Sequence, residues 1–359
     1  MVTFVANNFR FMSTFYPLTI KEIRRETQNA VSIVFEIPEN LKSTFQYIAG
    51  QYITIKKELN GSDVRRSYSI CSAPNSEEFR IAVKAVPNGT FSLFATSKLM
   101  EGDVLDVAPP EGRFILESDK NNENNYLAIA AGSGITPIMG MIKEVLINEP
   151  SSTFNLIYSN KSEEETIFKS EIDQFLNQYP NQFAVFYIYS RVAVDNALFG
   201  RVDEGNIRFI LNKNYSNTTF DTSFLCGPEP MIDVAKTVLI NYGIKSSAIL
   251  TELFSSTPVE PQEIHQGTSL ITVLVDDEET TFEMETSNTI LTAALNEGID
   301  APYSCQGGIC SSCLAKITSG SAVMDKNTIL SDEEVEEGFI LTCQAHPISQ
   351  KIAIDYDDV

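Results

Sequence analysis

The chain has 359 residues, of which 43% are hydrophobic and 21% are charged, and its net charge is −22. At about 150 residues per domain the length predicts two or three domains, and the composition excludes a disordered or fibrous chain. The negative charge argues against a nucleic-acid partner, because phosphate binding needs concentrated Lys and Arg. No stretch approaches the roughly 18 apolar residues that span a membrane, and no signal-peptide pattern is visible. We therefore expect a cytoplasmic protein without a membrane partner.

The acidic residues are concentrated near the C-terminus. Residues 263–359 hold 18 Asp and Glu against three Lys, a net charge of −15, whereas the first 262 residues carry −7. This change in charge density indicates a separate module. At the other end, the first eleven residues are interpreted as a short appendage, with Met12 as an alternative start to Met1.

The first segment, residues 18–116, alternates apolar and polar residues over short runs, for example at 31–37, 52–55 and 79–83. Such runs predict β-strands, and Pro87-Asn88-Gly89 offers a turn between two of them. No long helical pattern interrupts them. We expect an antiparallel β-barrel or sandwich and place this domain at residues 15–118.

From Tyr126 the rhythm changes to compact apolar strands that alternate with helices. Strands are predicted at 126–131, 154–159, 183–190, 223–227 and 248–254, and helices from about Ile135, near 167–179 and from Pro228. This alternation is typical of an α/β domain with a doubly wound parallel sheet. We place it at residues 119–256.

The third segment follows a stretch rich in Pro, Ser and other polar residues, which we interpret as a linker at residues 257–268. Strands at 270–275 and 280–285 and a helix near 289–296 then predict a small α+β domain at 269–359. Within it, Ser331 and Glu334 form a capping box at the head of an acidic run. The rest of the acidic excess either steers the module toward a basic partner or keeps it soluble.

Four cysteines of the third segment have the spacing of a plant-type [2Fe-2S] site. Cys305, Cys310 and Cys313 form C-x4-C-x2-C, and Cys343 follows after 29 intervening residues. A loop that wraps a cluster must present backbone N–H groups to the sulfurs, and the glycines at 307 and 308 permit this. The four cysteines are therefore the predicted metal ligands.

Two other metal sites fit the sequence less well. Structural zinc usually takes two separated pairs of ligands, and a Rieske centre needs two histidines. The chain has only His265, in the linker, and His346, which we expect at the surface beside the cluster loop.

Two short motifs suit a flavin. Arg65-Arg66-Ser67-Tyr68-Ser69 is expected at the start of a strand, and Gly89-Thr90-Phe91-Ser92 follows a turn. A flavin needs a guanidinium for phosphate, an aromatic ring against its own ring system and hydrogen-bond donors. Taken alone, the first motif is equally typical of an ordinary edge strand.

A nucleotide loop is predicted where the strand at 126–131 runs into Gly132-Ser133-Gly134-Ile135-Thr136-Pro137. Glycines between a strand and a helix let a pyrophosphate approach the backbone, although the third glycine of the usual fingerprint is missing. Farther on, Arg191 after Ser190 favours a 2′-phosphate and hence NADPH, while Asp195 keeps NADH open.

Cys226-Gly227-Pro228 ends another strand of the same segment. Cysteines at strand ends are usually small buried residues, and Gly and Pro at a helix start are ordinary. The residues alone therefore assign no function to Cys226.

The order of these motifs, together with E-L-F at 252–254, resembles the ferredoxin-NADP reductase superfamily, in particular members with a C-terminal plant-type ferredoxin domain. The resemblance covers nearly the whole chain from Phe15. It implies a multidomain protein with an antiparallel β-barrel flavin domain, a doubly wound α/β nucleotide domain and a β-grasp-like α+β ferredoxin domain. FAD, NADPH and a [2Fe-2S] cluster are the implied cofactors.

The resemblance also implies roles for individual residues. Those implied for the flavin are Arg66 on its phosphate, Tyr68 against its ring, Ser69 near N5, Ser67 beside them, Gly89 and Ser92 on the diphosphate, and Phe254 on the other ring face. Those implied for the nicotinamide nucleotide are Gly132, Gly134 and Thr136 in the loop, Ser190 and Arg191 on the 2′-phosphate, and Cys226 and Glu252 near the nicotinamide. Ser69, Cys226 and Glu252 are the implied catalytic residues. The chain departs from the family pattern at Leu253, where the family has Arg, and at Gln306, where it has Lys.

These modules suggest a common chemistry, because reduced nicotinamide gives up two electrons together whereas a [2Fe-2S] cluster accepts one. A flavin can take the pair and release it singly. The resemblance thus implies an NADPH-dependent oxidoreductase that passes electrons to an oxygenase, with a di-iron enzyme acting on phenylacetyl-CoA as a candidate acceptor. The alternatives are an NADH- or FMN-dependent reductase of another aromatic-ring or alkane oxygenase, and a redox sensor without steady turnover.

Overall fold

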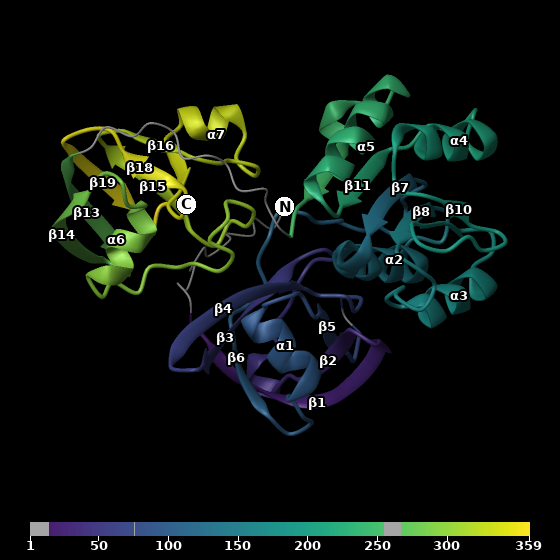
Figure 1. Ribbon diagram of the computed structural model, residues 1–359, viewed down its shortest axis with the longest axis horizontal. Coiled ribbons are helices and arrows are strands. Elements are labelled where there is room, and N and C mark those ends of the chain that lie inside the picture. Colours follow the sequence, from purple (N-terminus) through teal and green to yellow (C-terminus); the bar gives the residue numbers. More distant parts are fainter. Residues whose placement is uncertain (1–13, 75, 255–266) are drawn as a thin grey trace, which may run out of the picture. The chain divides into compact units, whose positions relative to one another are not determined.

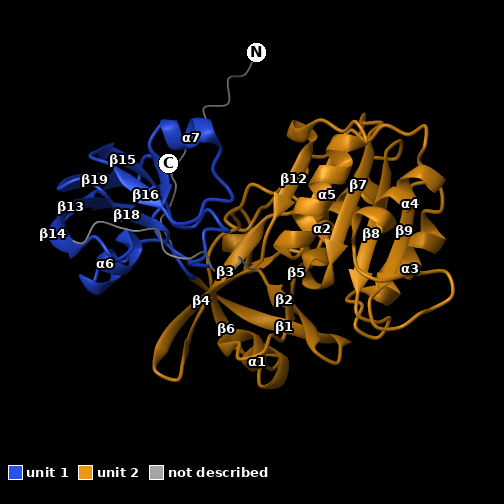
Figure 2. Cartoon of the chain, turned by 45° about the horizontal axis from the view of Figure 1, so that its top comes forward, with its two compact units in different colours: residues 1–15, 258–359 blue, residues 16–257 orange. Residues whose placement is uncertain are grey.

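The computed structural model of the chain describes residues 14–74, 76–254 and 267–359. The chain divides into two compact units, one of residues 16–257 and one of residues 258–359 together with 1–15 (Figure 2). The predicted appendage and nearly all of the predicted linker lie outside the described residues. Among the helices that the structure describes, none is long and apolar enough to cross a membrane.

The larger unit begins with an antiparallel sheet of order β4-β3-β6-β1-β2-β5 (Figure 1). Its strands are β1 (Tyr16–Thr27), β2 (Ala30–Glu36), β3 (Tyr52–Leu59), β4 (Ser62–Ser69), β5 (Phe79–Lys84) and β6 (Val104–Val107). A bridge between Ile70 and Ile81 joins the two edge strands, β4 and β5. Alternate apolar side chains such as Ile33, Ile53 and Ile81 are fully buried inside. The predicted barrel is confirmed.

Two local predictions in the barrel were wrong. The turn at Pro87-Asn88-Gly89 leads into helix α1 (Thr90–Ser97), not into a strand, and Phe91 is buried against the barrel. The R-R-S-Y-S motif fills the last five positions of β4, because the strand already begins at Ser62 after a turn at Asn60-Gly61. Both turn residues have positive φ, as a tight hairpin requires.

The second half of the larger unit is a parallel sheet of order β10-β9-β8-β7-β11-β12. Its strands are β7 (Asn125–Ala131), β8 (Thr153–Asn160), β9 (Phe183–Tyr189), β10 (Leu198–Phe199), β11 (Thr222–Cys226) and β12 (Ile249–Glu252). Its helices are α2 (Ile135–Asn148), α3 (Lys169–Gln178), α4 (Glu204–Asn214) and α5 (Glu229–Asn241). Helices α2 and α3 bury their apolar residues with one face of the sheet, and α4 and α5 with the other. The predicted doubly wound sheet is confirmed, although the sequence interpretation missed α4.

The smaller unit has a mixed sheet of order β14-β13-β19-β15-β17, in which β13 and β19 are parallel. Its elements are β13 (Thr268–Val275), β14 (Glu278–Glu285), α6 (Ile290–Asn296), β15 (Leu314–Ser319), β16 (Ala322–Met324), α7 (Asp332–Glu336), β17 (Phe339–Leu341), β18 (Ala345–Pro347) and β19 (Lys351–Asp355). Helix α6 packs Ile290 and Leu291 into the core of the sheet. The capping box of Ser331 and Glu334 starts α7 as expected.

Helix α2 lies against the flavin half through Gly140, and this contact leaves no room for a side chain. A Cβ at Gly140 would lie 2.9 Å from the carbonyl oxygen of Ile70 and 3.2 Å from that of Ser72. Since both are backbone atoms, we expect Gly140→Ala to lower the free energy of unfolding by roughly 1–3 kcal/mol, although alanine is the better helix former. Urea unfolding measures this.

The matched control is Gly205→Ala in α4, where the nearest atom to the new Cβ is 3.4 Å away. This variant should be as stable as the parent chain or more stable. If the two variants have equal stability, the close approach of α2 does not constrain the fold.

Candidate functional site

The order of the parallel sheet creates a topological switch point between β7 and β11. The chain leaves β7 toward β8 on one side, whereas β11 pairs on the other side. Ligands of such sheets bind outside the carboxyl ends of the strands at this point. There, Ala130 of β7 is in register with Cys226 of β11, which is in register with Glu252 of β12.

The loop after β7 lies directly on the end of β11. A Cβ at Gly134 would overlap the carbonyl oxygen of Cys226, and Gly132 has a φ of +55°. The buried Thr136 donates a hydrogen bond from its hydroxyl to the carbonyl of Ser133 at 3.1 Å. The glycines are thus required by the turn and by the neighbouring strand. The half-buried Gly132 and Ser133 lie just before the start of α2, where backbone N–H groups favour an anion.

The carboxyl group of Glu252 meets the end of β4 at the same place. The Ser69 hydroxyl donates to Glu252 Oε2 at 3.4 Å, which joins the flavin motif to the switch point. Burial raises the pKa of Glu252 to about 8, and the hydrogen bond from Ser69 opposes this rise only in part. At neutral pH the carboxyl group is therefore mostly protonated and can itself donate a hydrogen bond.

Cys226 is fully buried beside this carboxyl group. Burial, and then the charge of Glu252, raise the pKa of its thiol well above the usual value. Because the thiolate is the reactive form, Cys226 is not poised to act as a nucleophile.

The flavin motif on β4 presents its side chains alternately. Arg66 is exposed and donates to the carbonyl of Arg65 at 2.6 Å, whereas Ser69 is buried. The ring of Tyr68 packs on the ring of Phe91, with 5.5 Å between their centroids, and burial raises its pKa. Helix α1 therefore holds Tyr68 in place.

Gly89 stands just before α1 and lies against Ser92 of its first turn. The Ser92 hydroxyl accepts a hydrogen bond from the backbone N–H of Val86 at 3.3 Å. The structure thus brings Gly89 and Ser92 together at the N-terminus of a helix, where backbone N–H groups favour an anion.

The loops after β8 and β9 are tied to one another. The N–H of Ser190 donates to the carbonyl of Asn160 at 3.0 Å, and the N–H of Arg191 donates to that of Lys161 at 2.9 Å. Two cationic side chains, Arg191 and Lys161, therefore extend from adjacent exposed loops. Ser67 and Phe254 complete the predicted residues; Ser67 is half-buried on β4, and Phe254 lies two residues beyond β12 with 40% of its surface exposed.

The sequence interpretation missed Lys84, the last residue of β5. Its ammonium group would lie 3.7 Å from a Cβ at Gly132, so a cation from the flavin half reaches the nucleotide loop. Burial lowers the pKa of Lys84. A single Lys at the end of the apolar run F-R-I-A-V-K was the available signal.

The four predicted metal ligands come together in the smaller unit as two pairs. The sulfurs of Cys305 and Cys310 are 2.9 Å apart, and Cys313 lies within hydrogen-bonding reach of Cys343. No three His, Cys, Asp or Glu side chains in the described ranges are arranged to hold a single metal ion. Two pairs of thiolates instead suit the two irons of a [2Fe-2S] cluster.

The loop around Cys305 is built to stabilise a thiolate. The neighbouring Cys310 thiol and the backbone N–H groups of Gly307, Ile309 and Cys310 lower the pKa of Cys305 to about 6. Gly308 has a φ of +68°, and a Cβ there would lie 2.9 Å from the side chain of Gln344. The observed donors fit the cluster that the spacing predicted.

The predicted surface position of His346 was wrong. Its side chain is buried, with Nδ1 3.1 Å from the carbonyl oxygen of Thr286 and Nε2 3.1 Å from Asp325 Oδ2. Pairing of β18 with β16 places it opposite Val323. The backbone N–H of Asp325 donates to the carbonyl of Gln344, next to Cys343, so His346 supports the segment beside the cluster ligands.

Three parts of the chain match known families. Residues 17–115 match the oxidoreductase FAD-binding domain, 128–237 the oxidoreductase NAD-binding domain and 273–347 the 2Fe-2S iron-sulfur cluster binding domain. The chain is 33% identical to a component of the 1,2-phenylacetyl-CoA epoxidase of Escherichia coli strain K12, over 96% of this chain and 99% of that protein. It belongs to the ferredoxin-NADP reductase superfamily, in the branch with a [2Fe-2S] domain.

Other relatives match over nearly the whole chain. The ferredoxin reductase component of 3-ketosteroid-9-alpha-monooxygenase from Rhodococcus rhodochrous is 29% identical, over 94% of this chain and 96% of that protein. The crystal structure of phthalate dioxygenase reductase shares the fold, with a TM-score of 0.62 and 22% identity over 95% of this chain and 98% of that one. This family member is thus an oxidoreductase, the reductase component of an oxygenase system, with FAD and [2Fe-2S] electron transfer.

The raised pKa of Glu252 predicts how stability depends on pH. Between pH 4.5 and about 8 the folded chain keeps a proton on Glu252 that the unfolded chain releases. The contribution of this group to the free energy of unfolding is therefore fully present below pH 4.5 and is lost as the pH rises through about 8. As the pH rises over this range, we expect Glu252→Gln to become more stable than the parent chain. Above about pH 8 its free energy of unfolding should be higher by on the order of a few kcal/mol. Urea unfolding from pH 5 to 9, followed by flavin fluorescence, measures the gain.

Glu123→Gln, at an exposed carboxylate, is the matched control and should follow the pH dependence of the parent chain. Identical pH dependence of the Glu252 and Glu123 variants would refute the raised pKa.

Proposed function

We propose that this chain oxidises NADPH and delivers the electrons one at a time, through FAD and the [2Fe-2S] cluster, to an oxygenase. The observation that carries the proposal is the contact between Ser69 and Glu252, which joins the flavin motif to the switch point of the nucleotide sheet. Bound FAD supplies the conversion of a two-electron donor into single-electron steps. The side chains bind, orient and screen the reacting rings.

The proposed flavin site is formed by β4 and α1. Arg66 neutralises the flavin phosphate, Tyr68 stacks on the ring, and Ser67 and Ser69 offer hydrogen bonds, with Ser69 near N5. Gly89 and Ser92 receive the diphosphate at the N-terminus of α1, where the helix dipole favours negative charge. The packing of Tyr68 on Phe91 supports this assignment, because it links the two elements.

The proposed nicotinamide site is the switch point itself. Gly132, Gly134 and Thr136 surround the pyrophosphate, while Cys226 and Glu252 contact the nicotinamide. A protonated Glu252 can donate to the carboxamide oxygen, and the raised pKa of this group supports such a role. Phe254 would cover the remaining face of the flavin ring.

We propose NADPH as the donor because cations gather where the 2′-phosphate would bind. Ser190 and Arg191 follow β9, and Lys161 extends from the adjacent loop. A guanidinium can form two hydrogen bonds with a phosphate. Asp195, which would favour NADH, is exposed farther along the same loop.

The four cysteines Cys305, Cys310, Cys313 and Cys343 are the proposed ligands of the cluster. The domains are proposed at 15–118, 119–256 and 269–359 with a linker at 257–268, as the sequence predicts, and the cytoplasmic location stays a prediction. The oxygenase of a phenylacetyl-CoA epoxidase is the proposed acceptor, since the relative that belongs to such an epoxidase is similar over 99% of its length.

Anaerobic reduction tests the proposed path. Addition of NADPH should bleach first the flavin absorbance and then the cluster absorbance. We expect Cys310→Ser to contain less iron and to transfer no electrons to the oxygenase, because a cluster ligand is missing. NADPH should still reduce its flavin. Cys71→Ala, at a buried cysteine outside the cluster, is the control and should keep both. A reduced flavin beside a permanently oxidised cluster in the parent chain would contradict the path.

The choice of donor can be tested separately at Arg191. We expect Arg191→Ala to lower kcat/KM for NADPH by roughly 10- to 100-fold, since a charge-assisted pair with phosphate is lost. The value for NADH should hardly change. Arg201→Ala, at another exposed arginine, is the control. If Arg191→Ala lowers kcat/KM equally for NADPH and NADH, Arg191 does not recognise the 2′-phosphate.

A further inference from the structure

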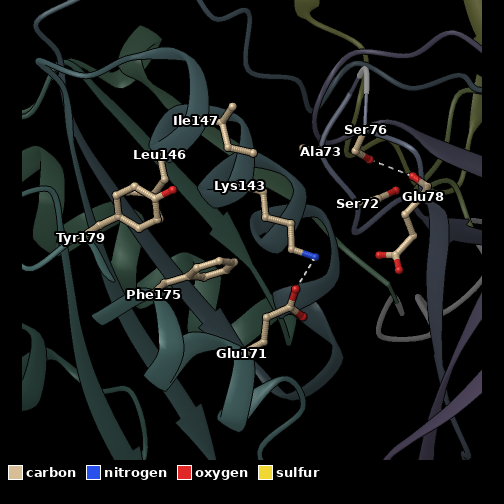
Figure 3. A pocket seen from close by; sticks show the side chains of 10 residues that line it. All are labelled: Ser72, Ala73, Ser76, Glu78, Lys143, Leu146, Ile147, Glu171, Phe175 and Tyr179. Atoms are coloured by element: carbon tan, nitrogen blue, oxygen red, sulfur yellow. Dashed lines mark hydrogen bonds and ion pairs between the residues drawn. The ribbon is translucent and has the colours of Figure 1, made fainter. Parts of the chain in front are cut away.

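A buried group of charges crosses between the flavin half and the nucleotide half of the larger unit. Arg80, on β5, is only 4% exposed, and its Nη2 lies 3.0 and 2.7 Å from the two carboxylate oxygens of Glu171 on α3. Lys143 of α2 reaches Glu171 Oε1 from the other side at 2.7 Å, and Figure 3 shows this pair. One carboxylate thus connects three elements from both halves.

The charges in this group depend on one another. Burial alone would raise the pKa of Glu171, but Lys143 and Arg80 outweigh burial and lower it. The guanidinium of Arg80 also lies over the ring of Phe168, 5.3 Å from its centroid, just before α3 begins. Arg80 also pairs through Nε with Glu78 Oε2 at 3.1 Å. Removal of Glu171 would therefore leave the buried charges of Arg80 and Lys143 with one carboxylate fewer, which proteins tolerate poorly.

The ion pairs lie beside apolar packing, since Cys71 and Ala82 of the flavin half share a core with Ile142 of α2. A cavity of about 220 Å³ lies beside them. Ser72, Ser76 and Glu78 line it from the flavin half, and Phe175 and Tyr179 from the nucleotide half (Figure 3). The charged groups thus add a specific contact between the halves at the edge of their shared apolar core.

The elements that carry the charges also form the proposed site. Helix α2, which carries Lys143, begins directly after the loop with Gly132 and Gly134. Strand β5, which carries Arg80, ends at Lys84 beside Gly132. A rotation of α2 against β5 would therefore move the nucleotide loop relative to the flavin strand.

We propose that Arg80, Glu171 and Lys143 form an interdomain clamp that holds the nicotinamide site in register with the flavin site. These are positioning residues, because they act through α2, α3 and β5 without touching either cofactor. The inference rests on the proposed function for its effect on the reaction. Small misplacements of reacting groups can lower rates by about 100-fold, so the clamp controls the transfer step more than the binding of FAD.

The test compares the parent chain, loaded with its cofactors, with Glu171→Gln and Arg80→Lys. The control is Asp173→Asn, which breaks the pair with Lys169 on the same helix but within one half. Three quantities are measured: the single-turnover rate of flavin reduction by NADPH, the long-wavelength absorbance of nicotinamide stacked on flavin, and hydrogen exchange in β5 and α3. Flavin content shows that each variant is folded.

We expect Glu171→Gln to slow flavin reduction at least tenfold, weaken the stacking absorbance and speed exchange in both elements, with flavin content unchanged. Arg80→Lys keeps the charge but loses the guanidinium, which contacts Glu171 through Nη2 and Glu78 through Nε, so it should show smaller changes of the same kind. It remains the decisive variant if Glu171→Gln does not fold.

Rates, absorbance and exchange equal to those of Asp173→Asn would overturn the clamp. If neither nicotinamide nucleotide reduces the parent chain, the proposed function fails instead. Exchange in β5 and α3 then still decides whether the clamp exists.

Discussion

The close packing of the flavin half on the nucleotide half is the constraint on which the proposed site depends. At that boundary the contact of Ser69 with Glu252 joins a strand end of the barrel to a strand end of the parallel sheet. Such closeness requires backbone to approach backbone. Gly134 permits it at the end of β11, and Gly140 permits it where α2 meets the residues that follow β4. The clamp around Glu171 adds a charged restraint at the same boundary.

Burial also determines the protonation state of Glu252. A carboxyl group in water would be ionised at neutral pH, but here desolvation raises its pKa to about 8. The same desolvation raises the pKa of Cys226 and keeps its thiol protonated. The proposed nicotinamide site therefore offers neutral hydrogen-bond donors, whereas the two cations proposed for the 2′-phosphate, Arg191 and Lys161, lie on exposed loops.

In the cysteine loop, hydrogen bonds lower a pKa that burial alone would raise. The Cys310 thiol and backbone N–H groups favour the thiolate of Cys305, in a loop where Gln306 and Gly308 have positive φ. His346 supports the neighbouring segment from inside through Asp325 and Thr286. Backbone dipoles can thus stabilise the negative charge that the thiolates bring to the cluster.

Much of the architecture could be predicted from the sequence, because apolar periodicity and motif spacing are local properties. The barrel, the parallel sheet and the ferredoxin-like domain were predicted correctly, and the four cysteines come together as their spacing indicates. The helices α1 and α4 were missed. In α1 the preceding turn also suits a hairpin, and α4 is a mostly polar helix with only Ile207, Ile210 and Leu211 buried.

The sequence by itself determined which chemistry the chain can hold, since thiolates, glycines and arginines in a given spacing carry that information along the backbone. Only the tertiary structure decided which of these groups meet. Residues 69 and 252 are 183 positions apart, and 80 and 171 are 91 apart. No local pattern links them, nor does any place His346 inside. Their contacts follow from strand order and helix packing, which bring distant residues together and set how deeply each charge is buried.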